Sequence, residues 1–346
     1  SRDWSSDVCS SDLSGLADLG IFTNAISNVS SMGFPFSSLK NGQSLLADHQ
    51  NFLIYPLGWI FPIWPSPIFL LFLQAYLVST GAVALFLLGR QRLGFSSNTT
   101  AWLPLTFWLC GPLRAALRFD FHPEIFMLPL FLFATFLLQE LSWKKRAWGT
   151  FLLLPALAAK ESAGPVACGL GIAWILGAGP AATRNFTRAI GLALTAIGAG
   201  VFYADSQVAP ALLGVHYAYS DLYEPLPSNL GSLALAPFSN PSLFFGRLFS
   251  ISRIKFFLGT LMPLGFLPLI SPAAIACLPG FLVLFLTKGD HRISLGYHYS
   301  LEPLTGLFFA LPSALEKISK NRWKNKALPI LALGSRSEEH TSELQS

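Results

Sequence analysis

Four ionisable residues alternate with other residues in the segment 118–124, Arg-Phe-Asp-Phe-His-Pro-Glu, between two apolar runs. In an extended chain alternate side chains point the same way, so Asp120, His122 and Glu124 would share one face. Carboxylates beside an imidazole can transfer protons, and ionisable groups in apolar surroundings are costly and tend to be functional. The segment therefore predicts three candidate catalytic residues, with an ion-paired helix boundary as the alternative.

Asp18 is a fourth candidate, at the start of the segment ADLGIFTNAISN. Apolar residues follow it at helical spacing, namely Leu19, Phe22, Ile26 and Val29. This spacing predicts an amphipathic helix on a membrane surface, with Asp18 in its first turn. The carboxylate could act as a base, or it could only cap the helix and favour its dipole.

Two adjacent pairs of residues are candidates for substrate binding. Asp48 and His49 precede an apolar stretch and could transfer protons or hold a metal, although a solvated loop would contain the same pair. Lys160 and Glu161 lie between two short apolar runs. They could offer a cation to a phosphate or form a self-neutralising structural pair.

The segment 288–299 contains a further group of cations, imidazoles and aromatic rings. Arg292, Tyr297 and His298 are the candidates here, because guanidinium and imidazole groups bind phosphate and aromatic rings stack on sugars. The same composition is typical of the interfacial belt of a membrane protein. The sequence lacks a phosphate-binding loop, a dinucleotide fingerprint, an HExxH motif and a nucleophile elbow, so nucleotide-driven chemistry is not predicted.

The elements that must position these residues are apolar. Hydrophobic residues make up 52% of the 346 and charged residues only 12%, compared with roughly 25% charged in a soluble domain. The polar ends differ from the rest: 3–13 and 336–346 resemble translated sequencing adapters. We therefore expect artefactual ends at 1–13 and 336–346 and one integral membrane domain over 14–335, truncated at both ends.

A spanning helix needs about 20 mainly apolar residues. The sequence predicts an all-α, polytopic transmembrane bundle with nine candidate spans and a tenth that begins near 327. The nine candidates are 67–88, 99–113, 123–138, 148–159, 163–179, 189–212, 254–270, 272–287 and 301–315.

The loops between these spans differ in charge. Lysines and arginines collect in the loops of one side, which the positive-inside rule assigns to the cytoplasm. Most acids and the histidines of 14–335 fall on the other side. We expect a multi-pass protein of the inner membrane with its site on the periplasmic or outer face, and the basic charge indicates topology rather than nucleic-acid binding.

Six ordered blocks carry a family resemblance: ADLGIFTNAISN, LADHQNF, FDFHPEIFMLPLFLF, AAKESAG, LMPLGFLPLISPAAIACLPGFLVLFL and LGYHYSLEPL. Together they resemble a bacterial family of predicted membrane proteins, domain of unknown function 2079. That family is similar to the GT-C superfold of glycosyltransferases, which take a sugar from a polyprenyl-phosphate carrier on the outer face.

This resemblance implies roles for the candidate residues. Asp18 would be the base or a metal contact, Asp120, His122 and Glu124 would line the sugar or metal site, and Lys160, Arg292 and His298 would neutralise the lipid phosphate. The block expected to read DHFSP is Asp48-His49-Gln50-Asn51-Phe52 here, and a KED-like block is Lys160-Glu161-Ser162, which puts a second metal-binding carboxylate in doubt.

Several alternatives stay open at this point. A transporter or flippase of a lipid-linked or small polar solute would show charged residues at mid-membrane and inverted repeats. A structural scaffold would show no convergence of the candidates. The lipid bilayer and a lipid-linked sugar are the expected partners, and the sequence determines neither the metal requirement nor the oligomeric state.

Overall fold

The computed structural model describes residues 17–47, 49–94, 96–213, 220–227 and 230–320. The two adapter-like ends, Asp48 and the start of the predicted tenth span lie outside the described residues. These described residues are helical, apart from turns, loops and one short antiparallel hairpin in which β1 (Phe36–Ser37) pairs with β2 (Gln43–Ser44).

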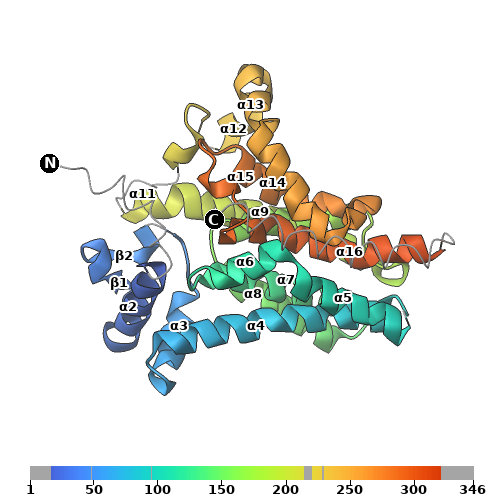
Figure 1. Ribbon diagram of the computed structural model, residues 1–346, viewed down its shortest axis with the longest axis horizontal. Coiled ribbons are helices and arrows are strands. Elements are labelled where there is room, and N and C mark those ends of the chain that lie inside the picture. Colours follow the sequence, from blue (N-terminus) through green and yellow to red (C-terminus); the bar gives the residue numbers. More distant parts are fainter. Residues whose placement is uncertain (1–16, 48, 95, 214–219, 228–229, 321–346) are drawn as a thin grey trace.

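The α-helices follow one another along the whole described chain (Figure 1). They are α2 (Ala17–Met32), α3 (Ile54–Ile60), α4 (Pro67–Leu87), α5 (Ser97–Leu109), α6 (Gly111–Arg118), α7 (Met127–Leu138), α8 (Trp143–Leu157), α9 (Ala163–Ile175), α10 (Arg184–Tyr203), α11 (Ala209–Leu213), α12 (Leu230–Ser239), α13 (Pro241–Leu248), α14 (Ile251–Leu261), α15 (Leu278–Phe285) and α16 (Leu301–Lys320).

Two helical stretches of the described chain, Pro67–Arg90 and Ala181–Leu212, are long and apolar enough to cross a membrane. They match the predicted spans 67–88 and 189–212. Other apolar helices are shorter, so the nine or ten complete spans that we predicted are not found among the described residues.

Breaks in the helices explain the shorter elements. The predicted span 99–113 is divided at Cys110, whose extended backbone separates α5 from α6. The predicted span 254–270 ends its α-helix at Leu261, and Gly265 and Phe266 then adopt left-handed conformations. Prolines at 263 and 268 add to this break, because proline cannot donate a helical hydrogen bond.

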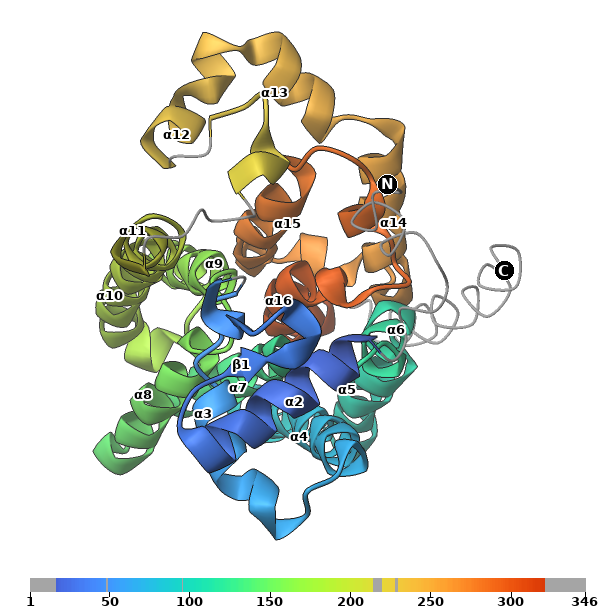
Figure 2. The same cartoon turned by 90° about the vertical axis from the view of Figure 1, so that its left-hand side faces the viewer.

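One large hydrophobic core runs through the molecule from α2 to α16. Helices α4, α7 and α16 run across the body of the molecule, and α2 and the hairpin lie at one end of it (Figures 1 and 2). Helices α12 and α13 project from the body on one side. A smaller cluster under the projecting helices includes Leu226 and Phe244.

Helices α9 and α10 pack through glycines spaced seven residues apart on each helix. A Cβ atom added at Gly164 would lie 2.5 Å from the carbonyl oxygen of Gly198, and one added at Gly191 would lie 2.7 Å from that of Gly171. Only glycines allow two backbones to approach this closely. The contact fixes the start of α9, which directly follows the predicted residues Lys160 and Glu161.

Helix α2 has the predicted apolar face, with Leu19, Phe22, Ile26 and Val29 all buried. This face packs on α3, where a Cβ atom added at Gly58 would lie 2.7 Å from Cβ of Val29. Protein therefore covers the face that we expected to rest on a membrane surface. The prediction of an amphipathic helix holds, and the predicted surface location of its apolar side does not.

Candidate functional site

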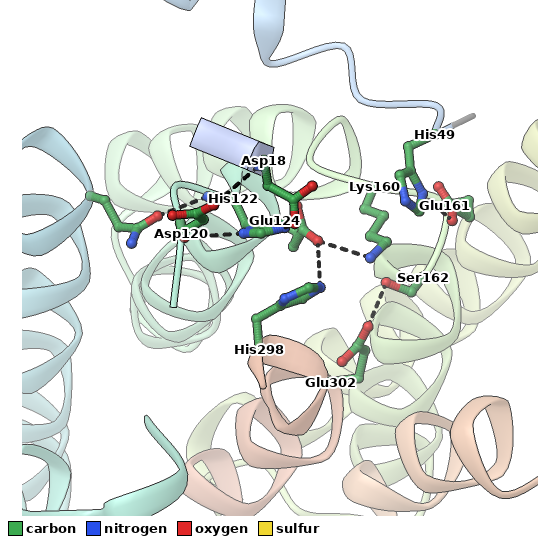
Figure 3. Close-up of polar contacts among 11 residues, drawn as sticks. Asp18, His49, Asp120, His122, Glu124, Lys160, Glu161, Ser162, His298 and Glu302 are labelled. Atoms are coloured by element: carbon green, nitrogen blue, oxygen red, sulfur yellow. Dashed lines mark hydrogen bonds and ion pairs between the residues drawn. The ribbon is translucent and has the colours of Figure 1, made fainter. Parts of the chain in front are cut away.

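The candidate residues converge beside the first turn of α2, which carries Asp18 (Figure 3). Five segments bring them together: the first turn of α2, the loop before α3, the connection 119–124 between α6 and α7, the loop between α8 and α9, and the segment that leads into α16. Each segment is a helix start or a short loop, so polar groups collect where the apolar helices begin.

Asp120 connects this region to α2. Its Oδ2 atom accepts hydrogen bonds from the backbone N–H groups of Asp18, at 3.1 Å, and Leu19, at 3.2 Å. Burial raises the pKa of Asp120, while these two hydrogen bonds act in the opposite direction. Asp120 thus binds the first turn of α2 and holds Asp18 in place.

His122 is the partner of Asp18. Its Nε2 atom lies 3.3 Å from Oδ2 of Asp18, and its Nδ1 atom lies 3.1 Å from the backbone oxygen of Asp120. Both partners are acceptors, so both ring nitrogens donate when the imidazole is protonated. Burial lowers the pKa of His122, but Glu124 and Asp18 outweigh burial and raise it overall.

His298 stacks on His122, with 3.9 Å between the ring centroids. Its Nε2 atom lies 3.3 Å from Oε1 of Glu124, whereas its Nδ1 atom has no hydrogen-bond partner among the described residues. Burial and the neighbouring His122 place the pKa of His298 well below its usual range. The pKa values of the two stacked imidazoles are therefore shifted in opposite directions.

Glu124 and Lys160 form a buried ion pair beside the stack. Nζ of Lys160 donates to Oε1 of Glu124 at 2.9 Å, and each side chain is only 4% exposed. Burial lowers the pKa of Lys160, but Glu124 and two further carboxylates raise it overall. Lys160 thus remains charged and joins the loop before α9 to the segment before α7.

A second pair lies on the other side of Lys160. Nδ1 of His49 lies 3.0 Å from Oε1 of Glu161. Burial raises the pKa of Glu161, but the charge and hydrogen bond of His49, together with the charge of Lys160, outweigh burial and lower the pKa to about 2. Burial lowers the pKa of His49. The carboxylate of Glu161 is therefore ionised across the physiological pH range.

Ser162 and Glu302 extend the site toward α16. The Ser162 hydroxyl donates to Oε1 of Glu302 at 3.0 Å, and both residues are buried. Oε2 of Glu302 and Oε2 of Glu161 have no hydrogen-bond partner among the described residues. Together with Nδ1 of His298 they are three buried polar atoms that a ligand rich in donors would satisfy.

Aromatic rings border the polar groups. Phe119 lies 5.2 Å from the ring centroids of His122, Tyr297 and His298. The Arg292 guanidinium lies 5.3 Å from the centroid of the Tyr299 ring, on which Lys160 also lies at 5.7 Å. The site thus combines flat apolar surfaces with a half-buried cation.

Three of these residues could hold a metal ion. His122, Glu124 and His298 each offer one ligand atom, and these atoms lie within 4.8 Å of one another. Two imidazoles and a carboxylate fit Zn²⁺, which would add positive charge for an anionic group when bound. Binding would require His122 to give up a proton and one of its two acceptors.

The structure brings together ten of the eleven predicted site residues, and the eleventh, Asp48, lies outside the described residues. Sequence reasoning missed Gln74, whose Oε1 accepts from the backbone N–H of His122 at 3.0 Å, and the Ser162–Glu302 pair. Glu302 stands four residues after His298, a helical spacing that could have indicated a shared face. Gln74 lies inside an apolar span, and a buried amide there is itself an indication of function.

Taken together, the two span-length helices and the buried cluster of acids, histidines and a lysine define an all-α membrane protein with a polar site at one end. The family of predicted membrane proteins described as DUF2079 matches residues 10–334, and the chain belongs to that family. Its association with a lipid bilayer follows from this membership. No curated protein and no solved structure matches the chain.

Proposed function

We propose that the protein is a GT-C-type glycosyltransferase that moves a sugar from a polyprenyl-phosphate carrier to an acceptor hydroxyl on the outer face of the inner membrane. The observation that carries the proposal is the pair formed by Asp18 and His122. The side chain of Asp18 is 40% exposed, whereas that of His122 is 8% exposed. A carboxylate that solvent can reach is thus held in one orientation by a buried imidazole.

In this mechanism the acceptor oxygen attacks the anomeric carbon of the sugar. The acceptor proton passes to the carboxylate of Asp18, and the bond between the anomeric carbon and the phosphate oxygen breaks. The polyprenyl phosphate leaves with the electron pair of that bond. Asp120 and His122 are positioning residues, because they hold the first turn of α2 and the Asp18 side chain.

The unsatisfied buried atoms support a polyhydroxylated ligand. Nδ1 of His298 and the Oε2 atoms of Glu161 and Glu302 need hydrogen-bond donors, which sugar hydroxyls supply. The phosphate has no donors when ionised, so it would bind the half-buried Arg292, with the charge of Lys160 behind it. Phe119, Tyr297 and Tyr299 offer rings for stacking on the sugar.

Replacement of Asp18 by Asn tests the assignment of the base. Purified protein would be assayed for transfer from a panel of radiolabelled polyprenyl-phosphate sugars, and the variant should lose about 10²- to 10⁴-fold in rate. Asp290→Asn is the matched control, because Asp290 also pairs with a cation, Arg253, but is 62% exposed and lies outside the cluster. Undiminished transfer by the Asp18→Asn variant would contradict the base assignment.

The rival function is transport or flipping of a lipid-linked or small polar solute. It predicts movement of a labelled lipid-linked sugar across reconstituted vesicles without cleavage of its phosphate bond. The position of the cluster at helix starts, and not in the middle of α4 or α10, favours transfer over transport. Flipping without cleavage would overturn our proposal.

A further inference from the structure

A second polar region lies at the opposite end of the helices from the candidate site. Helix α8 ends at Leu157, close to Lys160, and its first turn lies about 20 Å away, given a rise of about 1.5 Å per residue. Helix α9 runs away from the site and α10 returns beside it, so the start of α10 lies at the same far end.

A surface pocket is formed there by the first turns of α8 and α10. It is lined by Arg146, Thr183, Arg184, Asn185 and Phe186, together with two alanines. The guanidinium of Arg146 lies 3.6 Å from the centroid of the Phe186 ring, and its Nε donates to the backbone oxygen of Glu140 at 2.6 Å. Arg146 is thus fixed in the pocket wall, and among the described residues no hydrogen bond from its two terminal nitrogens is found.

The other groups of the pocket are also donors. Helix α10 has no side-chain hydrogen bond at its N-cap, Thr183. The backbone N–H of Arg184 donates to the backbone oxygen of Ala181, so the amides of Asn185 and Phe186 are the donors that this first turn offers to another acceptor. Thr183 is 4% exposed, and its hydroxyl has no hydrogen-bond partner among the described residues. No ion pair to Arg184 is found in the described part of the chain. A helix N-terminus with two arginines and a hydroxyl is complementary to a phosphate group.

The surroundings of the pocket identify the source of the phosphate. Trp143 and Trp148 on α8 are 72% and 61% exposed, and they flank Arg146 in the sequence. Exposed tryptophans are typical of the level of lipid headgroups. Basic pockets between helices at this level bind anionic headgroups. A pocket beside such residues lies where a phospholipid can present its phosphate.

We propose that this pocket binds the phosphate of an anionic phospholipid headgroup. Arg146 and Arg184 form ionic hydrogen bonds to the phosphate oxygens, and the first-turn amides of α10 complete the site. This binding anchors the start of α10 to the membrane surface. The site is separate from the cluster around Asp18, so the proposal does not depend on the function proposed above.

Native mass spectrometry of the delipidated chain in detergent tests this site. Dioleoylphosphatidylglycerol, dioleoylphosphatidylcholine and inorganic phosphate would be titrated separately. We expect the anionic lipid to bind at least tenfold more tightly than the zwitterionic lipid, because the latter carries its own compensating cation. Binding of inorganic phosphate without preference for the anionic lipid would overturn the lipid assignment.

Substitutions place the binding in the pocket. Arg184→Gln and Arg146→Gln should each weaken binding of the anionic lipid about tenfold. Arg188→Gln is the matched control: it removes the same charge one turn further along α10, from an exposed residue that does not line the pocket, and should change affinity less than twofold. Equal losses in Arg184→Gln and Arg188→Gln would show diffuse charge attraction and overturn the site.

Discussion

The imidazole rings of His122 and His298 are stacked, with centroids 3.9 Å apart and an angle of 23° between their planes. Two cations at this distance would repel each other strongly in a buried site. Their hydrogen bonds assign the charge, because both nitrogens of His122 face acceptors and Nδ1 of His298 faces none among the described residues. These hydrogen bonds therefore favour a protonated His122 stacked on a neutral His298.

This assignment predicts different titrations for the two residues. His122, with a raised pKa, should stay protonated above pH 6.5, whereas His298, with a strongly lowered pKa, should stay neutral well below it. Protonation of His122 contributes stability below pH 6.5 that is lost as the pH rises through its raised pKa. Nitrogen-15 NMR of histidine-labelled protein measures both, with His122→Gln and His298→Gln for assignment. Coincident titration near pH 6.5 would contradict the prediction.

The buried pair of Lys160 and Glu124 predicts a strong coupling. Lys160→Met should destabilise the protein by roughly 3–5 kcal/mol, because it removes the buried cation paired with Glu124 and leaves that carboxylate only its contact with His298. Glu124→Gln in the Lys160→Met background should recover most of this loss. Thermal unfolding in detergent measures both variants.

The control for this pair is Lys145→Met, which removes a partner of Glu140 from a side chain that is 51% exposed. Its effect should be below about 1 kcal/mol, as is usual for exposed pairs. Additive effects of Lys160→Met and Glu124→Gln would mean that the two charges do not interact.

Glu161 predicts a pH dependence of stability. Its pKa is about 2 in the folded protein and 4.5 in an unperturbed glutamate. A lowered pKa stabilises the fold above pH 4.5, and this stabilisation is lost as the pH falls from 4.5 toward 2. Glu161→Gln should therefore cost roughly 3 kcal/mol at pH 7 and progressively less below pH 4.5.

Unfolding at several pH values, followed by circular dichroism, measures this difference. Glu224→Gln is the control, because the Glu224 side chain is 64% exposed in its pair with Lys288. It should change stability little at any of these pH values. A constant difference between wild type and Glu161→Gln from pH 7 to pH 3 would exclude the proposed origin of the stability.

Sequence reasoning predicted the helical class and, among its nine candidate spans, the two helices that are long enough to cross a membrane. It also placed Asp18, His122, Lys160 and His298 on the same face of the membrane. These features follow from local composition and from ionisable residues placed where apolar runs begin. The role of Asp120 was not predictable. Its carboxylate binds backbone amides of α2, and this contact depends on the packing of segments that are distant in the sequence. The break at Cys110 was also missed. The break after Leu261 has a local cause, because the prolines at 263 and 268 interrupt the helical hydrogen bonds.

The glycine contact between α9 and α10 gives the last prediction, with a control on the same helix. Gly198→Ala should destabilise the protein by about 1–3 kcal/mol, because its new Cβ atom would lie 2.5 Å from the carbonyl oxygen of Gly164 and the helices must separate. Gly200 lies two residues away in α10 with nothing within 4 Å of an added Cβ atom. Gly200→Ala should leave stability unchanged or raise it by up to about 1 kcal/mol, since alanine favours the helix. Thermal unfolding of the two variants separates close packing from helix propensity, and equal shifts in both would contradict a tight contact between α9 and α10.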